Sequence, residues 1–295
     1  MNRLVLHLLF ILILSPAYAL AKDISIVASI KPLQFIAYEI TDGVTTPDLL
    51  VASTASPHDY ALRPSDVKKI ARADLVIWFG PELEPFMQGI MKGKKQSLRL
   101  GAEDSLSVHE YGDGHIDDGH NHGSHDPHIW LGPLQARQAA KIIADRLALI
   151  DPEHQVQYQS NFAKFESNLD SVTSEIEAKL APVRDKGYYV FHDAYGYFEE
   201  YFSLNKLGQF TVSPERKPGA KTLIKIKMAL RAGEASCVFS EPQFKSSIIE
   251  SVTRGSNVGQ GELDPLGLNI KVQKSAYFDF LNSLADSYTE CLTAN

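Results

Sequence analysis

The sequence predicts an α/β protein of two lobes, each a mostly parallel sheet flanked by helices, joined by one long rigid helix. Strand-like and helix-like segments alternate on both sides of the centre of the chain, which is typical of parallel βαβ units. A long helical pattern separates the two alternating regions. The composition, with 44% hydrophobic and 22% charged residues among 295, is that of a globular protein and excludes a disordered or fibrous chain.

The first lobe is expected over residues 22–150. Short apolar runs predict buried strands, at residues 24–29, 47–52 and 74–79. Helices are expected between and after them, at residues 32–40, from Pro64 with Ser65 as the N-cap, and at 134–150.

The connecting helix is expected over residues 151–182. Its apolar side chains recur on one face, in the series Val156, Phe162, Phe165, Leu169, Val172, Ile176 and Leu180. A helix of this length reaches about 40 Å, which is long for one small lobe. We therefore expect it to run across both lobes.

The second lobe is expected over residues 183–295. Strands are predicted at residues 188–191 and 235–239, and helices at 195–202, 246–253 and 275–292. The alternation again indicates a parallel sheet.

The first residues, 1–21, have the pattern of a secretory signal peptide. Arg3 precedes an apolar run over residues 4–14, and two small-x-small sites follow, which favours cleavage after Ala21. No cysteine stands at that site, which argues against a lipid anchor, and no later segment is apolar enough to span a membrane. We expect a soluble, exported, monomeric protein.

The charge balance argues against one class of partner. Lys and Arg number 29 against 36 Asp and Glu, a formal net charge of −7. Binding nucleic acid through its phosphates requires a basic face, so no nucleic-acid partner is expected.

The two cysteines, Cys237 and Cys291, are expected to form a disulfide. Cys237 lies in a predicted strand and Cys291 near the end of the last helix. In an oxidising compartment a lone pair of cysteines usually forms a bond. The alternative is two free, buried thiols.

Histidines are concentrated in one polar segment. Six of the ten lie between residues 109 and 128, among Gly, Asp, Asn and Ser. This composition predicts a flexible surface loop, residues 109–125, that binds metal ions weakly. Its ligands would be His109, His115, His120, His122 and His125. The alternative is a solvated loop whose histidines bind nothing.

Three histidines are candidates for a preorganised site: His58, His128 and His192. Two of them follow predicted strands, where ligands bind in open α/β sheets, and His128 begins the ordered segment after the histidine-rich loop. Each has an aspartate within two residues, namely Asp59, Asp126 or Asp193. A ligating imidazole usually donates its second N–H to a carboxylate or carbonyl, but adjacent side chains on a strand point apart, so the partners stay open.

Several short segments resemble the ZnuA family of periplasmic zinc-binding proteins that serve ABC importers. They run through the chain in the family's order: Ala55-Ser56-Pro57-His58-Asp59-Tyr60, Asp126-Pro127-His128-Ile129-Trp130-Leu131, Phe191-His192-Asp193-Ala194-Tyr195, Glu241-Pro242-Gln243-Phe244 and Leu263-Asp264-Pro265-Leu266-Gly267. The resemblance, which includes the cysteine pair, implies a Zn²⁺ ion buried between the lobes and held by His58, His128 and His192. It also implies a periplasmic location and a membrane permease as partner.

The chain departs from the family pattern at Pro57, where some zinc-specific members carry Glu. The fourth ligand would then be a water or Asp264, the position from which manganese-binding relatives supply a carboxylate. Three imidazoles and one oxygen suit zinc better than manganese.

Other functions would use the same residues. A manganese- or iron-binding member of the same importer class is one alternative, and an exported zinc hydrolase is another, because three histidines and a water also form catalytic zinc sites. Against an enzyme, the chain has no complete His-Glu-x-x-His or Gly-x-Ser-x-Gly motif. A third alternative is a metal-buffering chaperone in which only the histidine-rich loop binds.

Overall fold

Two four-stranded parallel sheets form the framework of the protein in the computed structural model, which describes residues 24–110, 125–244 and 247–294. Helices flank both sheets, so the predicted fold class is confirmed. The predicted signal peptide and His115, His120 and His122 lie outside the described residues. Among the helices that are described, none combines the length and the apolar character needed to cross a bilayer.

The first sheet has the strand order β2-β1-β3-β4. Its strands are β1 (Ile26–Ala28), β2 (Asp48–Leu49), β3 (Leu75–Trp78) and β4 (Ser97–Arg99). Alternate side chains of β1 and β3 enter two different cores, because successive residues of a strand point to opposite faces. One face packs against α1 (Lys31–Thr41), and the other against α2 (Pro64–Arg72) and α3 (Gln88–Met91).

The second sheet has the order β6-β5-β7-β8. Its strands are β5 (Tyr188–His192), β6 (Lys206–Thr211), β7 (Cys237–Ser240) and β8 (Gly259–Glu262). Helices α6 (Gly196–Tyr201) and α9 (Ala276–Thr293) pack on one face, and α7 (Ala220–Arg231) and α8 (Ser247–Thr253) on the other.

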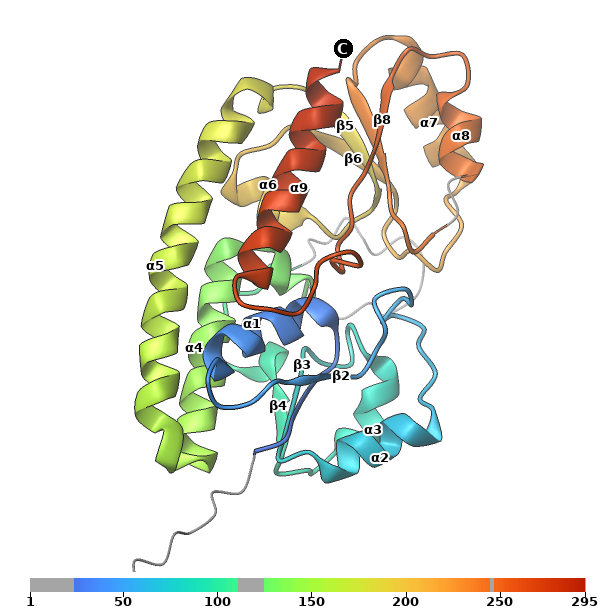
Figure 1. The fold of residues 1–295 in the computed structure, drawn as a ribbon. Helices are drawn as coiled ribbons and strands as arrows, with labels where there is room; N and C mark the ends of the chain where they lie inside the picture. The colour runs from blue at the N-terminus through green and yellow to red at the C-terminus, as the bar shows by residue number, and fades with distance from the viewer. Residues whose placement is uncertain (1–23, 111–124, 245–246, 295) are drawn as a thin grey trace, which may run out of the picture.

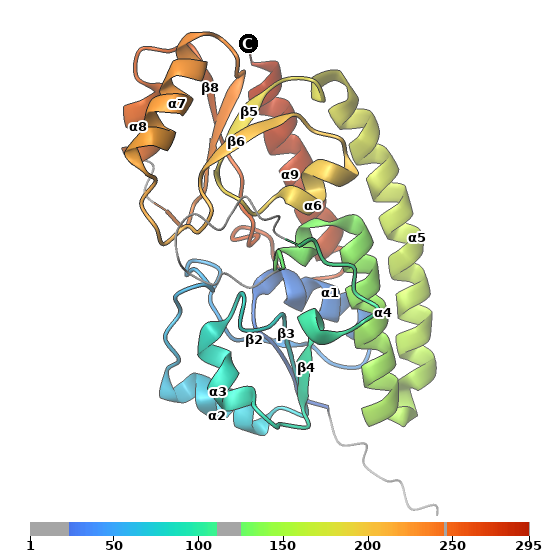
Figure 2. The same ribbon diagram turned by 180° about the vertical axis from the view of Figure 1, so that it is seen from behind.

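Helix α5 (Gln155–Leu180) runs along both lobes beside α4 (Pro133–Ile150), as Figures 1 and 2 show from opposite sides. Its 26 residues span about 39 Å. Most of the predicted apolar stripe is buried against α1, α4 and α9, but Val172 is half-buried and Val156 is exposed. Val156, in the first turn of α5, is 83% exposed, whereas Tyr158 in the same turn is buried, so Val156 points away from the packed face.

The inner faces of the two lobes share one hydrophobic core, which includes side chains from both sheets and from α1, α4, α5 and α9. Two buried hydrogen bonds connect its parts. The Trp130 indole N–H donates to the carbonyl of Pro265 (2.7 Å), and the Tyr277 hydroxyl donates to the carbonyl of Trp130 (2.8 Å). The lobes are therefore packed together and not only tethered by a helix.

Several local expectations were incomplete. The sequence patterns missed α3, α7, β4, β6 and β8. The N-cap of α2 is Arg63 and not Ser65, two residues earlier than expected. The Asp66 carboxylate at the third helical position accepts the backbone N–H of Arg63 (2.8 Å), which is one half of a capping box.

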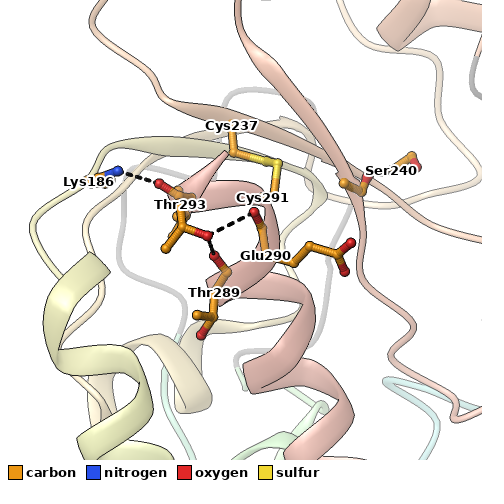
Figure 3. Close-up of a disulfide and its surroundings, with 9 residues drawn as sticks. Lys186, Cys237, Ser240, Thr289, Glu290, Cys291 and Thr293 are labelled. Atoms are coloured by element: carbon orange, nitrogen blue, oxygen red, sulfur yellow. Dashed lines mark hydrogen bonds between the residues drawn. A yellow bond between two sulfur atoms is a disulfide. The ribbon is translucent and has the colours of Figure 1, made fainter. Parts of the chain in front are cut away.

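The expected disulfide between Cys237 and Cys291 is present and joins β7 to the last turns of α9 (Figure 3). The two Cα atoms lie 6.0 Å apart, and the bond links two residues that are 54 positions apart in sequence. It fixes α9 against the sheet of the second lobe.

Candidate metal centre

Three histidine rings from separate parts of the chain meet between the lobes. His58 lies in the loop between β2 and α2, His128 precedes a 3₁₀ turn (Ile129–Leu131), and His192 is the last residue of β5. One ring nitrogen from each lies within 4.8 Å of the others, a spacing that could hold a metal ion. The rings of His128 and His192 are buried, and that of His58 is half-buried. The three predicted candidates are thus together, although they are far apart in sequence.

A buried carboxylate orients His128. Asp126 Oδ1 lies 2.7 Å from His128 Nδ1 and also accepts the backbone N–H of His128 (3.0 Å). Tyr197 in α6 donates its hydroxyl to the carbonyl of Asp126 (2.7 Å). These bonds fix the direction in which the His128 ring points.

A second buried carboxylate orients His192. Glu241, which follows β7, places Oε1 2.6 Å from His192 Nδ1 and is only 2% exposed. An Nδ1–H group that donates to the carboxylate leaves the Nε2 lone pair free to bind a cation. The same tautomer follows for His128 from its bond to Asp126.

The Nε2 atoms of His128 and His192 face each other at 3.4 Å. If both Nδ1 atoms carry the proton, two lone pairs meet at this distance in a buried setting. Such an arrangement favours a cation or a proton between the rings, because lone pairs repel where water cannot separate them.

The electrostatic surroundings raise the pKa of His192 above 6.5. Burial alone would lower this pKa, but the charge and hydrogen bond of Glu241 outweigh it, with smaller contributions from Glu215 and Asp193. The site therefore attracts positive charge, whether a proton or a metal ion.

The other predicted carboxylates lie elsewhere. Asp59 is exposed, and Asp193 pairs with Lys206 (2.7 Å) and Gln209 (3.2 Å) instead of His192. Asp264 is not in the group of three: its carboxylate accepts the N–H groups of the backbone at 266 and 268 and of Gln243. Asp126, in contrast, contacts the ring of His128.

Sequence reasoning assigned no role to Glu241. The residue is 49 positions from His192 in sequence, so no local motif joins them. It does follow a predicted strand of the same sheet, and the strand-end rule that indicated His192 could have indicated Glu241 as well.

The three rings line a cavity of about 20 Å³. A cavity of this size holds roughly one water-sized particle. Its remaining lining is mostly apolar and comes from both lobes: Pro57, Trp130, Pro214, Phe244, Pro265 and Leu266, with Ser56, Glu241 and Gln243. The space therefore suits a single ion more than an organic ligand.

The two described histidines of the histidine-rich loop lie apart from this group. His109 stacks on Tyr197 with ring centroids 4.0 Å apart, and its Nε2 lies 3.0 Å from Glu200 Oε2. His125 forms an isolated antiparallel bridge with Glu110. The bridge between Glu110 and His125 brings the two ends of the histidine-rich segment together.

Comparison with protein families and curated relatives gives one consistent answer. The family described as zinc-uptake complex component A, periplasmic (ZnuA) matches residues 26–291. The chain is 41% identical to the high-affinity zinc uptake system protein ZnuA of Yersinia pestis, over 95% of each chain. It is 43% identical to the protein of the same name from Haemophilus ducreyi, over 91% of this chain and 93% of that one.

Solved structures show the same fold. A crystal structure of ZnuA matches with a TM-score of 0.78 at 23% identity, covering 92% of this chain and 99% of that one. A zinc-bound ZnuA deletion mutant gives 0.78 at 23% identity, over 93% and 100% of the two chains. The substrate-binding protein FpvC from Pseudomonas aeruginosa, in complex with Mn²⁺, gives 0.79 at 20% identity, over 92% and 99%.

Proposed function

Because the chain belongs to the ZnuA family of periplasmic zinc-uptake components, we propose that it captures Zn²⁺ between its lobes and delivers it to the membrane permease of an ABC importer. The observation that carries this proposal is the meeting of three imidazoles from distant parts of the chain around a cavity of about 20 Å³. The choice of zinc as the metal and of uptake as the process comes from the names of the relatives.

His58, His128 and His192 are the proposed ligands, with Asp126 and Glu241 holding two of the rings. A water is the proposed fourth ligand, because Pro57 offers no donor and the Asp264 carboxylate already accepts several N–H groups. Three nitrogens and one oxygen favour zinc, whereas manganese prefers sites with more oxygen ligands.

The proposed setting is the periplasm, reached by means of the signal peptide at residues 1–21. Delivery to a permease requires a difference between the loaded and the empty protein. Because the lobes share one core, we expect small shifts of loops and lobes and not a wide opening. The histidine-rich loop is proposed as a second, weaker class of zinc sites that exchange ions quickly.

Competitive titration against a chromogenic zinc chelator, with Mn²⁺ as the competing metal, tests the proposal. We expect tight binding of one Zn²⁺ that excess Mn²⁺ does not displace, and loss of that site in His58→Ala and His192→Ala. His154→Ala, outside the site, is the matched control and should bind normally. Unchanged tight binding in both site variants would contradict the assignment, and stronger binding of manganese would favour the manganese-importer alternative.

A further inference from the structure

The loop that carries His58 is joined to the opposite lobe by a hydrogen bond beside the metal site. The Ser56 hydroxyl donates to Glu215 Oε1 (2.6 Å), and Glu215 belongs to the segment after β6 in the second lobe. Ser56 Oγ also accepts the backbone N–H of His58 (3.2 Å). Ser213 donates to the other carboxylate oxygen of Glu215 (2.7 Å). These bonds connect the backbone of His58 to the facing lobe.

Residues next to this bond form part of the cavity wall. Pro57 and Pro214, each adjacent to one partner of the Ser56–Glu215 pair, are buried and line the cavity from opposite lobes. Ser56 is half-buried and Glu215 is exposed, so the bond lies at the solvent side of this wall. An ion that leaves past the two prolines has to separate segments that this bond holds together.

His58 depends on such a restraint more than the other two histidines do. His128 follows an anchored aspartate, and His192 ends a central strand. His58 is half-buried, in a loop between β2 and α2 that has no helix or strand of its own. Because a ligand on a loop is held less firmly than one on a strand, its position is set by the contacts of the loop.

We propose that Glu215 is a positioning residue which, through Ser56, holds His58 in its ligating position and slows the escape of the ion. The inference rests on the proposed zinc-binding function and adds to it a determinant of ion release. Glu215 acts on the dissociation rate, because the bond must break for the His58 loop to move away from the opposite lobe. Gln243 Nε2 donates to the carbonyl of Ser53 (3.2 Å), so the loop keeps a second contact with that lobe when Glu215 is replaced.

Stopped-flow mixing of the zinc-loaded protein with excess chelator measures the dissociation rate. We expect Glu215→Ala and Ser56→Ala each to raise that rate roughly three- to tenfold, the range for one partly exposed hydrogen bond to a carboxylate. The double variant should be no faster than the faster single variant, because both changes remove the same bond. Glu215→Gln keeps an acceptor oxygen for Ser56 and should release zinc closer to the unmodified rate.

Glu234→Ala is the matched control, since this exposed glutamate precedes β7 and so lies at the opposite end of the sheet from the site. It should leave the rate unchanged, and the thermal unfolding of the metal-free protein should be the same in all variants. Faster release in Glu215→Ala but not in Ser56→Ala would overturn the inference, because the effect would then be one of charge alone. Unchanged rates in both variants, with tight zinc binding retained, would overturn it without affecting the proposed function. If the unmodified protein bound no zinc tightly, the proposed function would fail, and this inference with it.

Discussion

Replacing Glu241 with glutamine should weaken zinc binding in a manner that depends on pH. Gln has the shape of Glu, and its carbonyl oxygen can still accept the His192 Nδ1–H at the 2.6 Å position, so the ring keeps its orientation. What is lost is the negative charge, which makes Nε2 a better donor to a cation. Loss of such a partner typically weakens metal binding 10- to 100-fold, or about 1.4–2.7 kcal/mol.

The proton competes with the metal for the same nitrogen. Although burial alone would lower the pKa of His192, Glu241 raises it above 6.5 in the metal-free protein, so zinc must displace a proton at mildly acidic pH. Without the carboxylate charge the pKa of His192 falls, so a smaller fraction of the Gln variant carries a proton that zinc must displace. The full loss of zinc affinity in the Glu241→Gln variant should therefore be seen at pH 8. At pH 6 the difference in zinc affinity between the variant and the unmodified protein should be smaller.

Competition with a chelator in zinc-buffered solutions at pH 8 and pH 6 measures both effects. Glu262→Gln is the control. This exposed carboxylate ends β8, the strand next to β7, but is not among the groups that shift the pKa of His192. Equal affinities of the Glu241→Gln variant and the unmodified protein at pH 8 would refute the orienting role of Glu241. A gap as wide at pH 6 as at pH 8 would refute the competition with the proton.

Three further measurements test other parts of the structure. Zinc at a thousandfold excess over its dissociation constant should stabilise the protein by about 4 kcal/mol, and His128→Ala should abolish the zinc-dependent rise in Tm seen by calorimetry. Replacing Cys237 and Cys291 with serine should lower the free energy of unfolding in urea by about 4 kcal/mol, from the entropy of a loop of 54 residues; an equal midpoint and slope would contradict this. Burial raises the pKa of Glu84 from 4.5 to about 7, so the protonated carboxyl stabilises the fold at low pH, and this stability is lost as the pH rises through 7. Glu84→Gln should therefore remove on the order of 3 kcal/mol from the change in unfolding free energy between pH 5 and 8. An unchanged pH profile would show that the carboxyl does not titrate in this range.

The sequence indicated the three histidines because strand ends and chain spacing are local features. His192 follows an apolar run, and in an open α/β sheet that position faces the ligand. Glu241 was missed because its partner, His192, comes from another strand. Neither local sequence indicates that these two strands lie side by side. Asp193 illustrates the converse, since it neighbours His192 in sequence but points away to Lys206.

The missed elements lack the periodic pattern on which such predictions depend. Strand β8 reads Gly259-Gln260-Gly261-Glu262 and contains no apolar side chain. It forms because β7 offers it a parallel edge with which to pair. In α7 the apolar residues Ile224 and Met228 are 60% and 67% exposed, so the hydrophobic residues of this helix do not form a single buried face. Tertiary contacts decide such segments, and a single sequence does not display them.

The small volume of the cavity bears on which ions can enter. A divalent cation in water carries a full hydration shell, and about 20 Å³ leaves room for little beyond the bare ion and a neighbouring ligand. Admission thus requires the ion to exchange most of its waters for imidazole nitrogen. Magnesium gives up water reluctantly and prefers oxygen donors, so it should remain outside, whereas zinc exchanges water for nitrogen readily.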